Sequence, residues 1–394
     1  KADLCIAGRD RQLLHSQPLL AAELERQVLP DGGHISRNPW VLVELLLDLL
    51  PLRQVFAARG KKPDDALLAA IARMTPMLRH LRLGDGMLAR FNGMGAAAEH
   101  GVLATVLAYD AQPAAIALRS GYARLARGST LIIADVGSPP PLDVAGAACA
   151  GCLSFELSTG AEPLLVNAGA PGSAEGARRP LSRGTASHNT LCLNEQSSSK
   201  LVRNARLERR IGAPPILHPD NVTCEAREVD GGIRLQACHD GYVQRFGLIH
   251  TRTLELSPDG YSLRGTDRLD AAKGVLRFAQ DVPLALHFHL HPDAQVVLGA
   301  TPDAAELLLD SGEQWRLTAS GIAVSIEESL HLADIAGARR AQQVVLRTVC
   351  YGATEIMWMF QRIREGRPRD STGRKHTRNR VPLSERLADT DAGF

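Results

Sequence analysis

The chain has 394 residues, enough for two domains, because a single hydrophobic core seldom grows beyond about 250–300 residues. Its apolar fraction of 45% and charged fraction of 22% are typical of an ordinary folded domain, and a net charge of +2 over this length gives no indication of nucleic-acid binding. No apolar run approaches the roughly 20 residues of a membrane span, so we expect no membrane span.

Cysteine usage bears on the compartment. Seven cysteines, an odd number scattered along the chain, do not form the pattern of a disulfide framework, which favours a reducing compartment such as the cytoplasm. The chain begins at Lys1, without Met and inside a helical pattern. We therefore expect that an upstream segment is missing, and that a signal peptide was lost with it if the protein is exported.

The first part of the chain has the periodicity of helices. Apolar residues recur at i, i+3, i+4 and i+7 in four segments, over residues 13–29, 41–58, 64–81 and 97–111. Asp64 and Asp65 behind Pro63 are typical of a helix start. Long helices joined by polar, Gly-rich links predict paired antiparallel helices over residues 1–114, as in part of an α/α bundle or toroid.

From about residue 120 the period changes from helical to alternating. Short alternating segments, separated by Gly, Pro, Asp or Asn, predict an antiparallel β-sandwich over residues 115–360. They are TLIIADV, CLSFEL, PLLVNAG, NTLCLNE, GIRLQACH, YSLRGTDRL, ALHFHLH, AELLLD, QWRLTAS and IAVSIEES. The predicted fold class is thus α+β and multidomain, with part of an α/α bundle or toroid followed by an antiparallel β-sandwich.

The segment from residue 361 to 394 loses this periodicity. It carries nine Arg and Lys against five acidic residues. A solvated, disordered end is the expectation, and a nucleic-acid-binding tail is the alternative.

One helix–helix connection carries more polar chemistry than a turn needs. The stretch LPDGGHISRNPWVL, residues 29–42, places His34, Arg37 and Asn38 in a Gly-hinged loop. A connection between two apolar helices requires only a stop, a turn and a cap. The surplus of imidazole and guanidinium groups marks this loop as a candidate site.

Two further patterns suggest metal binding, each beside a simpler interpretation. HFHLH places His287, His289 and His291 on one face of a strand, where three imidazoles can hold Zn²⁺ or can form a plain solvent face. CAGC contains Cys149 and Cys152, but a single pair does not complete a tetrahedral zinc site. Taken alone, this pair predicts buried thiols.

Two segments of the sandwich carry polar residues beside strands. TASHNTL places His188 and Asn189 at a strand mouth after Arg183, which suits an acid, a base or a ligand and equally a structural role. HDGY offers His239 and Tyr242, which suit a sugar or carboxylate site, or a sandwich corner. No P-loop, nucleophile elbow or GxGxxG fingerprint is present.

Taken in order, these segments resemble the heparinase II/III-like proteins, a group of polysaccharide lyases. ELERQVLPDGGHISRNP resembles the family loop ELxxQxLPDGGHxERSPxYH, and CLSFELSTGAEPLLVNAG resembles the strand pair HAHADxLSFxLxxxGxxLLVDPG. ASHNTLCLNEQSS resembles AHNTVxVDGxxQ, and HDGY with FGLIHTRTLEL resembles HxGYxxxxxxHxRxxxL. The resemblance covers about residues 23–360 and implies an α/α toroid followed by a β-sandwich.

The resemblance implies β-elimination on anionic, uronate-containing polysaccharides such as glycosaminoglycan or alginate. In that reaction a base removes the C5 proton and an acid protonates the leaving oxygen, while polar groups stabilise charge on the carboxylate. On this basis the catalytic candidates are His34, Arg37, His188 and Tyr242. The substrate-binding candidates are Asn38, Arg183, Asn189 and His239, and the loop of residues 29–42 would line a sugar cleft between the domains.

The match is uneven residue by residue. The family's Tyr falls on Val41, and the first His of its HAHAD motif falls on Ala147. A family zinc trio of His, Asp and His would here become Cys149, Asn167 and His188. Zinc is therefore the one cofactor that the resemblance suggests.

The sequence leaves three functions open, of which we predict the first. The first is a polysaccharide lyase in the cell envelope or periplasm, as the resemblance implies, and the second is a catalytically degenerate protein that binds an anionic glycan without cutting it. The third is a structural or partner-binding protein, which leaves the polar loop unexplained. No oligomeric state follows from the sequence.

Overall fold

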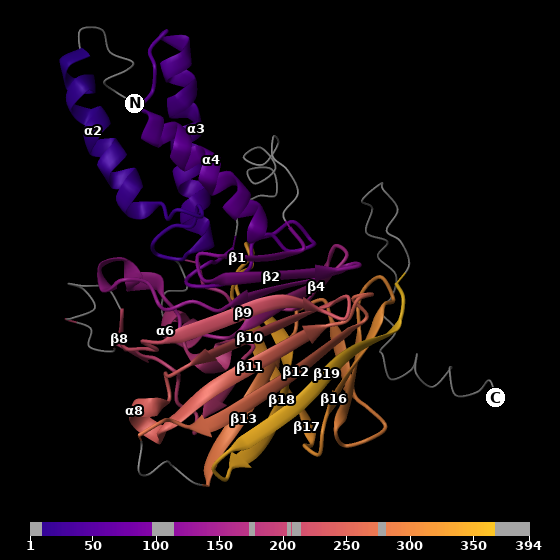
Figure 1. The fold of residues 1–394 in the computed structure, drawn as a ribbon. Helices are drawn as coiled ribbons and strands as arrows, with labels where there is room; N and C mark the ends of the chain where they lie inside the picture. The colour runs from indigo at the N-terminus through magenta and orange to yellow at the C-terminus, as the bar shows by residue number, and fades with distance from the viewer. Residues whose placement is uncertain are drawn as a thin grey trace.

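The computed structural model describes residues 10–96, 114–172, 178–202, 206, 214–274 and 281–366. Its N-terminal part is a helical layer of α2 (Asp10–Gln27), α3 (Pro39–Ala58) and α4 (Asp65–His80). This layer lies over the first β-sheet (Figure 1). The helix predicted over residues 97–111 lies outside the described residues, as do residues 367–394.

Local sequence explains where two of these helices begin. Asn38 caps α3 by accepting a hydrogen bond from the Trp40 amide, and Pro39 occupies the first turn, where no amide hydrogen is needed. Asp64 caps α4 in the same way through the Ala66 amide. In the described residues no helix combines the length and the apolar character that crossing a membrane requires.

The first sheet has the order β1-β2-β3-β4-β5, with all neighbours antiparallel. Its strands are β1 (Ile116–Arg119), β2 (Tyr122–Arg127), β3 (Thr130–Asp135), β4 (Phe155–Thr159) and β5 (Glu162–Leu165). Tight turns with positive φ, at Gly121 and Gly128, join its first three strands.

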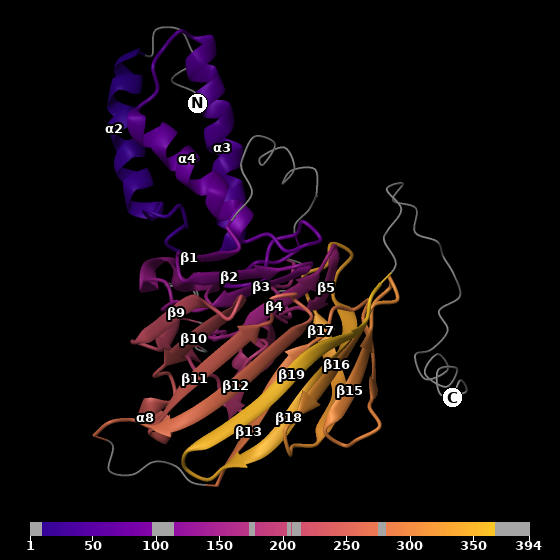
Figure 2. The same cartoon turned by 45° about the vertical axis from the view of Figure 1, so that its right-hand side comes forward.

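Two further antiparallel sheets form the sandwich (Figure 2). The eight-stranded sheet, in the order β14-β15-β16-β19-β12-β11-β10-β9, contains β9 (Val222–Val229), β10 (Gly232–His239), β11 (Leu248–Leu256), β12 (Ser262–Ala271), β14 (Gln295–Leu298), β15 (Ala304–Leu308), β16 (Gln314–Ala319) and β19 (Thr354–Arg364). The four-stranded sheet, in the order β17-β18-β13-β6, contains β6 (Leu191–Leu193), β13 (Val282–His289), β17 (Val324–His331) and β18 (Arg339–Cys350).

Short elements lie at the ends of the sandwich. They are the two-stranded pair β7 (Lys200–Leu201) and β8 (Pro215–Leu217), the helices α6 (Arg179–Ser182) and α8 (Val243–Phe246), and the 3-10 turns η1 (Leu142–Ala147) and η3 (Thr185–Ser187). The turn η3 leads directly to His188 and β6, so it positions one of the candidate site residues.

The five-stranded sheet lies between two hydrophobic cores. Tyr122 and Ile133 belong to the core that contains the helices, whereas Ala123 and Ile132 belong to the core of the sandwich. Successive side chains of a strand point to opposite faces, so one sheet serves both cores.

The structure confirms the predicted fold class, since a few N-terminal helices are followed by several antiparallel sheets. The ten predicted strand segments each contain or overlap a strand. Strand β19 continues to Arg364, so residues 361–364 belong to the sandwich and not to the tail.

Candidate functional site

The loop between α2 and α3 is clamped to the first sheet. Asp31 accepts hydrogen bonds from both the backbone amide and the hydroxyl of Ser120, in the β1–β2 turn. Gly32 has a φ of 95°, and a Cβ there would lie 1.9 Å from the carbonyl oxygen of Arg73 in α4. The loop therefore packs at the junction of the helices and the sheet.

All the N–H groups of the Arg37 guanidinium donate hydrogen bonds at this junction. Its Nη2 bonds Asp135 at 2.6 Å and the Gly121 carbonyl at 2.8 Å, and its Nη1 bonds the carbonyls of Gly137 and Ser138 at 3.0 and 2.9 Å. Its Nε donates to the Ser120 carbonyl at 3.2 Å. Because a guanidinium has five N–H groups, no donor is left over for a substrate.

His34 and Asn38 also have partners within the protein. The His34 ring nitrogens lie 2.7 Å from Ser36 Oγ and 3.0 Å from Gln27 Oε1, and burial lowers the pKa of His34. The side-chain carbonyl oxygen of Asn38 accepts a hydrogen bond from the Trp40 amide and so caps the start of α3. The structure thus gives local structural contacts to all three candidate residues of the loop.

His188 belongs to the candidate segment TASHNTL and directly follows η3. Its Nδ1 donates to the Gly184 carbonyl at 2.7 Å, which makes Nε2 the basic nitrogen. The ring lies against Gly151, where a Cβ would come within 2.6 Å of Cδ2. Burial lowers the pKa of His188, so the imidazole is neutral near pH 7. Of the four catalytic candidates, His188 keeps the chemistry of a base.

The neighbouring binding candidates support the backbone. The Asn189 side chain donates to the Phe155 carbonyl at 2.8 Å and accepts from the His289 amide at 2.6 Å. Arg183 Nε donates to the Ala148 carbonyl at 2.7 Å. The Asn189 bonds hold the segment before β6 against β4 and β13, and the Arg183 bond joins the end of α6 to the end of η1.

Tyr242 and His239 are buried beneath the sandwich corner. The Tyr242 hydroxyl donates to the Leu191 carbonyl at 2.8 Å, and the residue has 0% exposure. His239 Nε2 lies 3.3 Å from Nδ1 of His250, whose Nε2 lies 2.7 Å from Asp267. Asp267 also pairs with Arg252 at 2.8 Å.

Sequence reasoning missed the buried partners of these residues. They are Arg90, Asn92, Asp135, Glu156, Arg252 and Asp267. Arg252 and Asp267 stand at inward positions of alternating strands, and a charged residue at such a position is the signal that would have found them. Glu156 pairs with Arg90 at 3.4 Å, and burial raises its pKa to about 7.

The residues at the family's zinc positions do not fit that ion. Asn167 is fully buried; its carbonyl oxygen accepts from the Asn189 amide at 2.9 Å and its Nδ2 donates to the Arg90 carbonyl at 3.4 Å. Burial raises the pKa of Cys149, which opposes the thiolate that zinc requires. In the described part of the chain no group of three or more His, Cys, Asp or Glu is placed to hold a metal ion.

The three histidines of HFHLH are divided between separate contacts. His287 bonds Gln343 at 3.0 Å, and His289 bonds Ser329 at 2.8 Å and the Ala186 carbonyl at 2.9 Å. His291 lies past the end of β13, with its ring 5.7 Å from that of His331. Cys149 and Cys152 are free thiols, and only Cys152 is fully buried.

Comparison with known proteins agrees with this architecture. The model of the Heparinase II/III-like, C-terminal family matches residues 110–359. FtsZ-localized protein C of Caulobacter vibrioides is 33% identical over 360 residues, which cover 88% of this chain and 61% of that relative. The chain therefore spans less than two thirds of this relative's length.

Solved structures show the same fold. The crystal structure of heparan sulfate lyase HepC from Pedobacter heparinus matches with a TM-score of 0.71 at 14% identity, covering 94% of this chain and 60% of that one. A crystal structure of heparinase III matches with a TM-score of 0.70 at 12% identity, covering 90% and 58%. Fold, motifs and family model agree, and the chain belongs to the heparinase II/III-like family.

Proposed function

We propose that this chain belongs to a heparinase II/III-like protein that no longer cleaves polysaccharide and instead acts by binding at the site of cell division. The observation that carries the first half is Val41, which stands where the family loop has Tyr. Arg37, whose position is also Arg in that loop, is bound to protein oxygens through all five N–H groups. A guanidinium in this state cannot stabilise a uronate carboxylate in a transition state without breaking the junction it holds.

The two positions that could transfer a proton support the loss of cleavage. Val41, which can neither give nor take a proton, stands where the family motif has Tyr. Tyr242 is fully buried and its hydroxyl proton is committed to the Leu191 carbonyl. A proton-transfer group must lie within hydrogen-bond reach of its substrate, and neither residue meets that condition.

The place of action is proposed from a relative. FtsZ-localized protein C, 33% identical over most of this chain, carries a localisation in its name. We therefore propose the division site as the location and an assembly containing FtsZ as the partner. No step of this proposal requires a metal ion.

A second candidate is the polysaccharide lyase itself, with an anionic glycan as the partner. His188 favours it, because the hydrogen bond to Gly184 leaves Nε2 as a proton acceptor on a neutral ring. Under this candidate the protein would be placed in the cell envelope, and binding without cleavage would be its degenerate form.

One experiment on the full-length protein separates these functions. The protein is incubated with alginate, heparan sulfate, chondroitin sulfate and hyaluronan, and the ultraviolet absorbance of the 4,5-unsaturated uronate is followed. We expect no growth of absorbance with any substrate. Growth that disappears in His188→Ala would establish the lyase and refute our proposal.

The binding half is tested by co-sedimentation of the full-length protein with polymerised FtsZ, and by imaging a fluorescent fusion in cells. We expect the protein in the pellet only with polymer, and a fluorescent band at mid-cell. A protein that stays in the supernatant and is distributed evenly in the cell would contradict the division-site role.

A further inference from the structure

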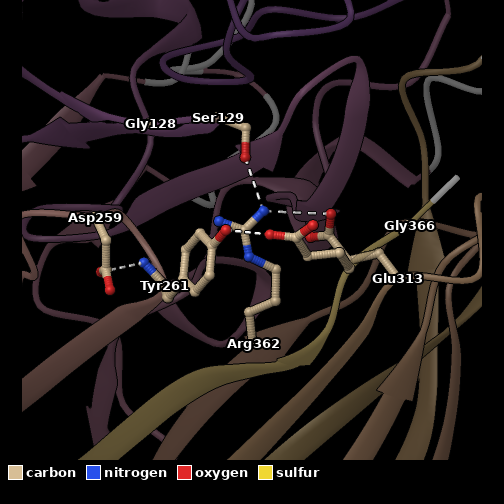
Figure 3. A pocket seen from close by; sticks show the side chains of 8 residues that line it. Gly128, Ser129, Asp259, Tyr261, Glu313, Arg362 and Gly366 are labelled. Atoms are coloured by element: carbon tan, nitrogen blue, oxygen red, sulfur yellow. Dashed lines mark hydrogen bonds and ion pairs between the residues drawn. The ribbon is translucent and has the colours of Figure 1, made fainter. Parts of the chain in front are cut away.

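A surface cavity of about 410 Å³ lies where the β2–β3 turn meets the ends of three strands of the eight-stranded sheet. Its lining residues are Gly128, Ser129, Asp259, Tyr261, Glu313, Arg362, Glu365 and Gly366 (Figure 3). None of the candidate residues of the family motifs contributes to it. Its volume is within the range of small-molecule sites in proteins.

Arg362 stands at a position of β19 where an apolar residue is expected. Ile356, Trp358 and Phe360 precede it at alternate positions and are buried in the sandwich core. The Arg362 side chain is only 6% exposed, although a buried charge is costly unless it is paired. A charged guanidinium at the end of this row of core-facing apolar residues is therefore unexpected unless it has a structural or binding role.

Only one end of the Arg362 guanidinium has partners among the described residues. Its Nη1 donates to Ser129 Oγ at 2.9 Å and lies 3.5 Å from the Glu313 carboxylate. Its Nε and Nη2 are buried and have no hydrogen-bond partner in the described part of the chain. These two nitrogens form the side edge of a guanidinium, whose parallel N–H groups match the two oxygens of a carboxylate.

The rest of the cavity is acidic. Asp259, Glu313 and Glu365 bring three carboxylates against the one guanidinium, which leaves two unbalanced negative charges. A simple carboxylate would be repelled by these groups. A ligand that satisfies both features carries a carboxylate for Arg362 and positive groups for Asp259 and Glu365.

Tyr261 stacks on the face of the Arg362 guanidinium. Its ring lies 3.8 Å from the guanidinium carbon of Arg362, and its hydroxyl donates to Glu365 (Figure 3). Tyr261 is 38% exposed, so its side chain has solvent to move into. Because Nε and Nη2 are buried, a ligand can reach them only if neighbouring side chains move. Tyr261 is the exposed one, and we expect its ring to rotate away and release the Glu365 carboxylate.

We propose that this cavity is a binding site for a basic α-amino acid. The ligand's carboxylate binds the Nε and Nη2 edge of Arg362, and its ammonium groups lie beside Asp259 and Glu365. The site is independent of the division-site proposal, because its residues take no part in the family motifs.

The test is isothermal titration calorimetry on the full-length protein with three probes. L-lysine carries both features, L-norleucine lacks the side-chain ammonium, and 1,5-diaminopentane lacks the carboxylate. We expect L-lysine to bind at least about tenfold more tightly than either of the others. Equal binding of 1,5-diaminopentane, or no binding of L-lysine, would overturn the proposal.

Substitutions test whether L-lysine binds in this cavity. Arg362→Lys keeps the charge but loses the fork, and is expected to weaken L-lysine binding by about tenfold. Glu365→Gln, at an exposed residue that does not hold the core, should weaken L-lysine but leave L-norleucine unchanged. Arg364→Gln, on the same strand and outside the cavity, is the matched control and should bind as the unchanged protein does. If Arg362→Lys and Glu365→Gln both bind L-lysine with full affinity, the assignment of this cavity is wrong.

Discussion

Arg37 directs its guanidinium at four backbone carbonyls and the Asp135 carboxylate, while its own backbone has a φ of 56°. This geometry ties the helix–helix loop to the turns around β2 and β3. In this chain the arginine predicted as a catalytic residue connects two layers of the fold.

Removing this side chain should be strongly destabilising. Arg37→Ala leaves the Asp135 carboxylate, 3% exposed, without its ion-pair partner. Loss of one partner of a buried ion pair costs about 3–5 kcal/mol, which urea unfolding will measure. Arg53→Ala, at an exposed position of α3, is the control and should change the free energy of unfolding by less than about 0.5 kcal/mol. A loss as small as the control's in Arg37→Ala would contradict the structural role.

At this scale the sequence identified polar residues but not their partners. The acceptors of Arg37 lie 83 to 101 residues further along the chain, and no spacing pattern links such positions. The same holds for Arg252, which bonds the Leu153 and Asn189 carbonyls in the loops that precede β4 and β6. Residue type indicated that these side chains would form hydrogen bonds. Only the fold shows whether the partners of these hydrogen bonds are backbone atoms or a substrate.

At the scale of single elements, the role of Asn38 distinguishes a structural loop from a substrate-binding loop. Its side chain accepts from the Trp40 amide at 2.9 Å, which starts α3. Asn38→Ala should therefore lower the free energy of unfolding by about 1 kcal/mol, and Asn38→Ser, which keeps a capping oxygen, should lower it much less. Thermal or urea unfolding measures both.

The matched comparison is Asp64→Ala, which removes the corresponding cap of α4. Similar losses in Asn38→Ala and Asp64→Ala would confirm that Asn38 acts as a cap. If Asn38→Ala has no effect on stability and instead weakens binding of an anionic glycan, the substrate-binding interpretation would be right.

The elements themselves were largely predictable. Alternation of apolar and polar residues identified the strand segments because the sandwich buries one face of most of them. The sandwich was predicted to end at residue 360, whereas β19 continues to Arg364. Arg362 occupies a core-facing position of this strand and interrupts the apolar row that a pattern search follows. A charged residue of this kind can be recognised as part of a strand only when its surroundings are known.

The whole molecule buries many histidines, and this predicts its response to acid. Burial lowers the pKa of His80 and of His291 to about 4 and that of His289 to about 3. Near pH 7 these groups are neutral in both the folded and the unfolded chain. As the pH falls below about 6.5 the unfolded chain binds protons that the folded chain does not, so stability is lost.

We expect the free energy of unfolding to fall steadily from pH 6.5 towards pH 4, with each such histidine contributing up to about 1.4 kcal/mol per pH unit. Glu156, whose pKa burial raises to about 7, acts in the opposite direction between pH 4.5 and 7. Urea unfolding at a series of pH values measures the balance, and His289→Gln should reduce the slope. A free energy of unfolding that stays constant from pH 7 to pH 4.5 would contradict this prediction. It would mean that the protonated imidazoles find hydrogen-bond partners in the folded chain.

The five-stranded sheet has a consequence for how the protein can be divided. The family model begins at residue 110, so the helices lie outside the conserved unit that the model describes. Yet Tyr122 and Ile133, within that unit, complete the helical core. A fragment cut at the family boundary would turn this face of the sheet towards water as a bare apolar surface. The unit that the family model describes and the unit that folds therefore have different boundaries, and a shortened protein should retain the helices so that this face stays covered.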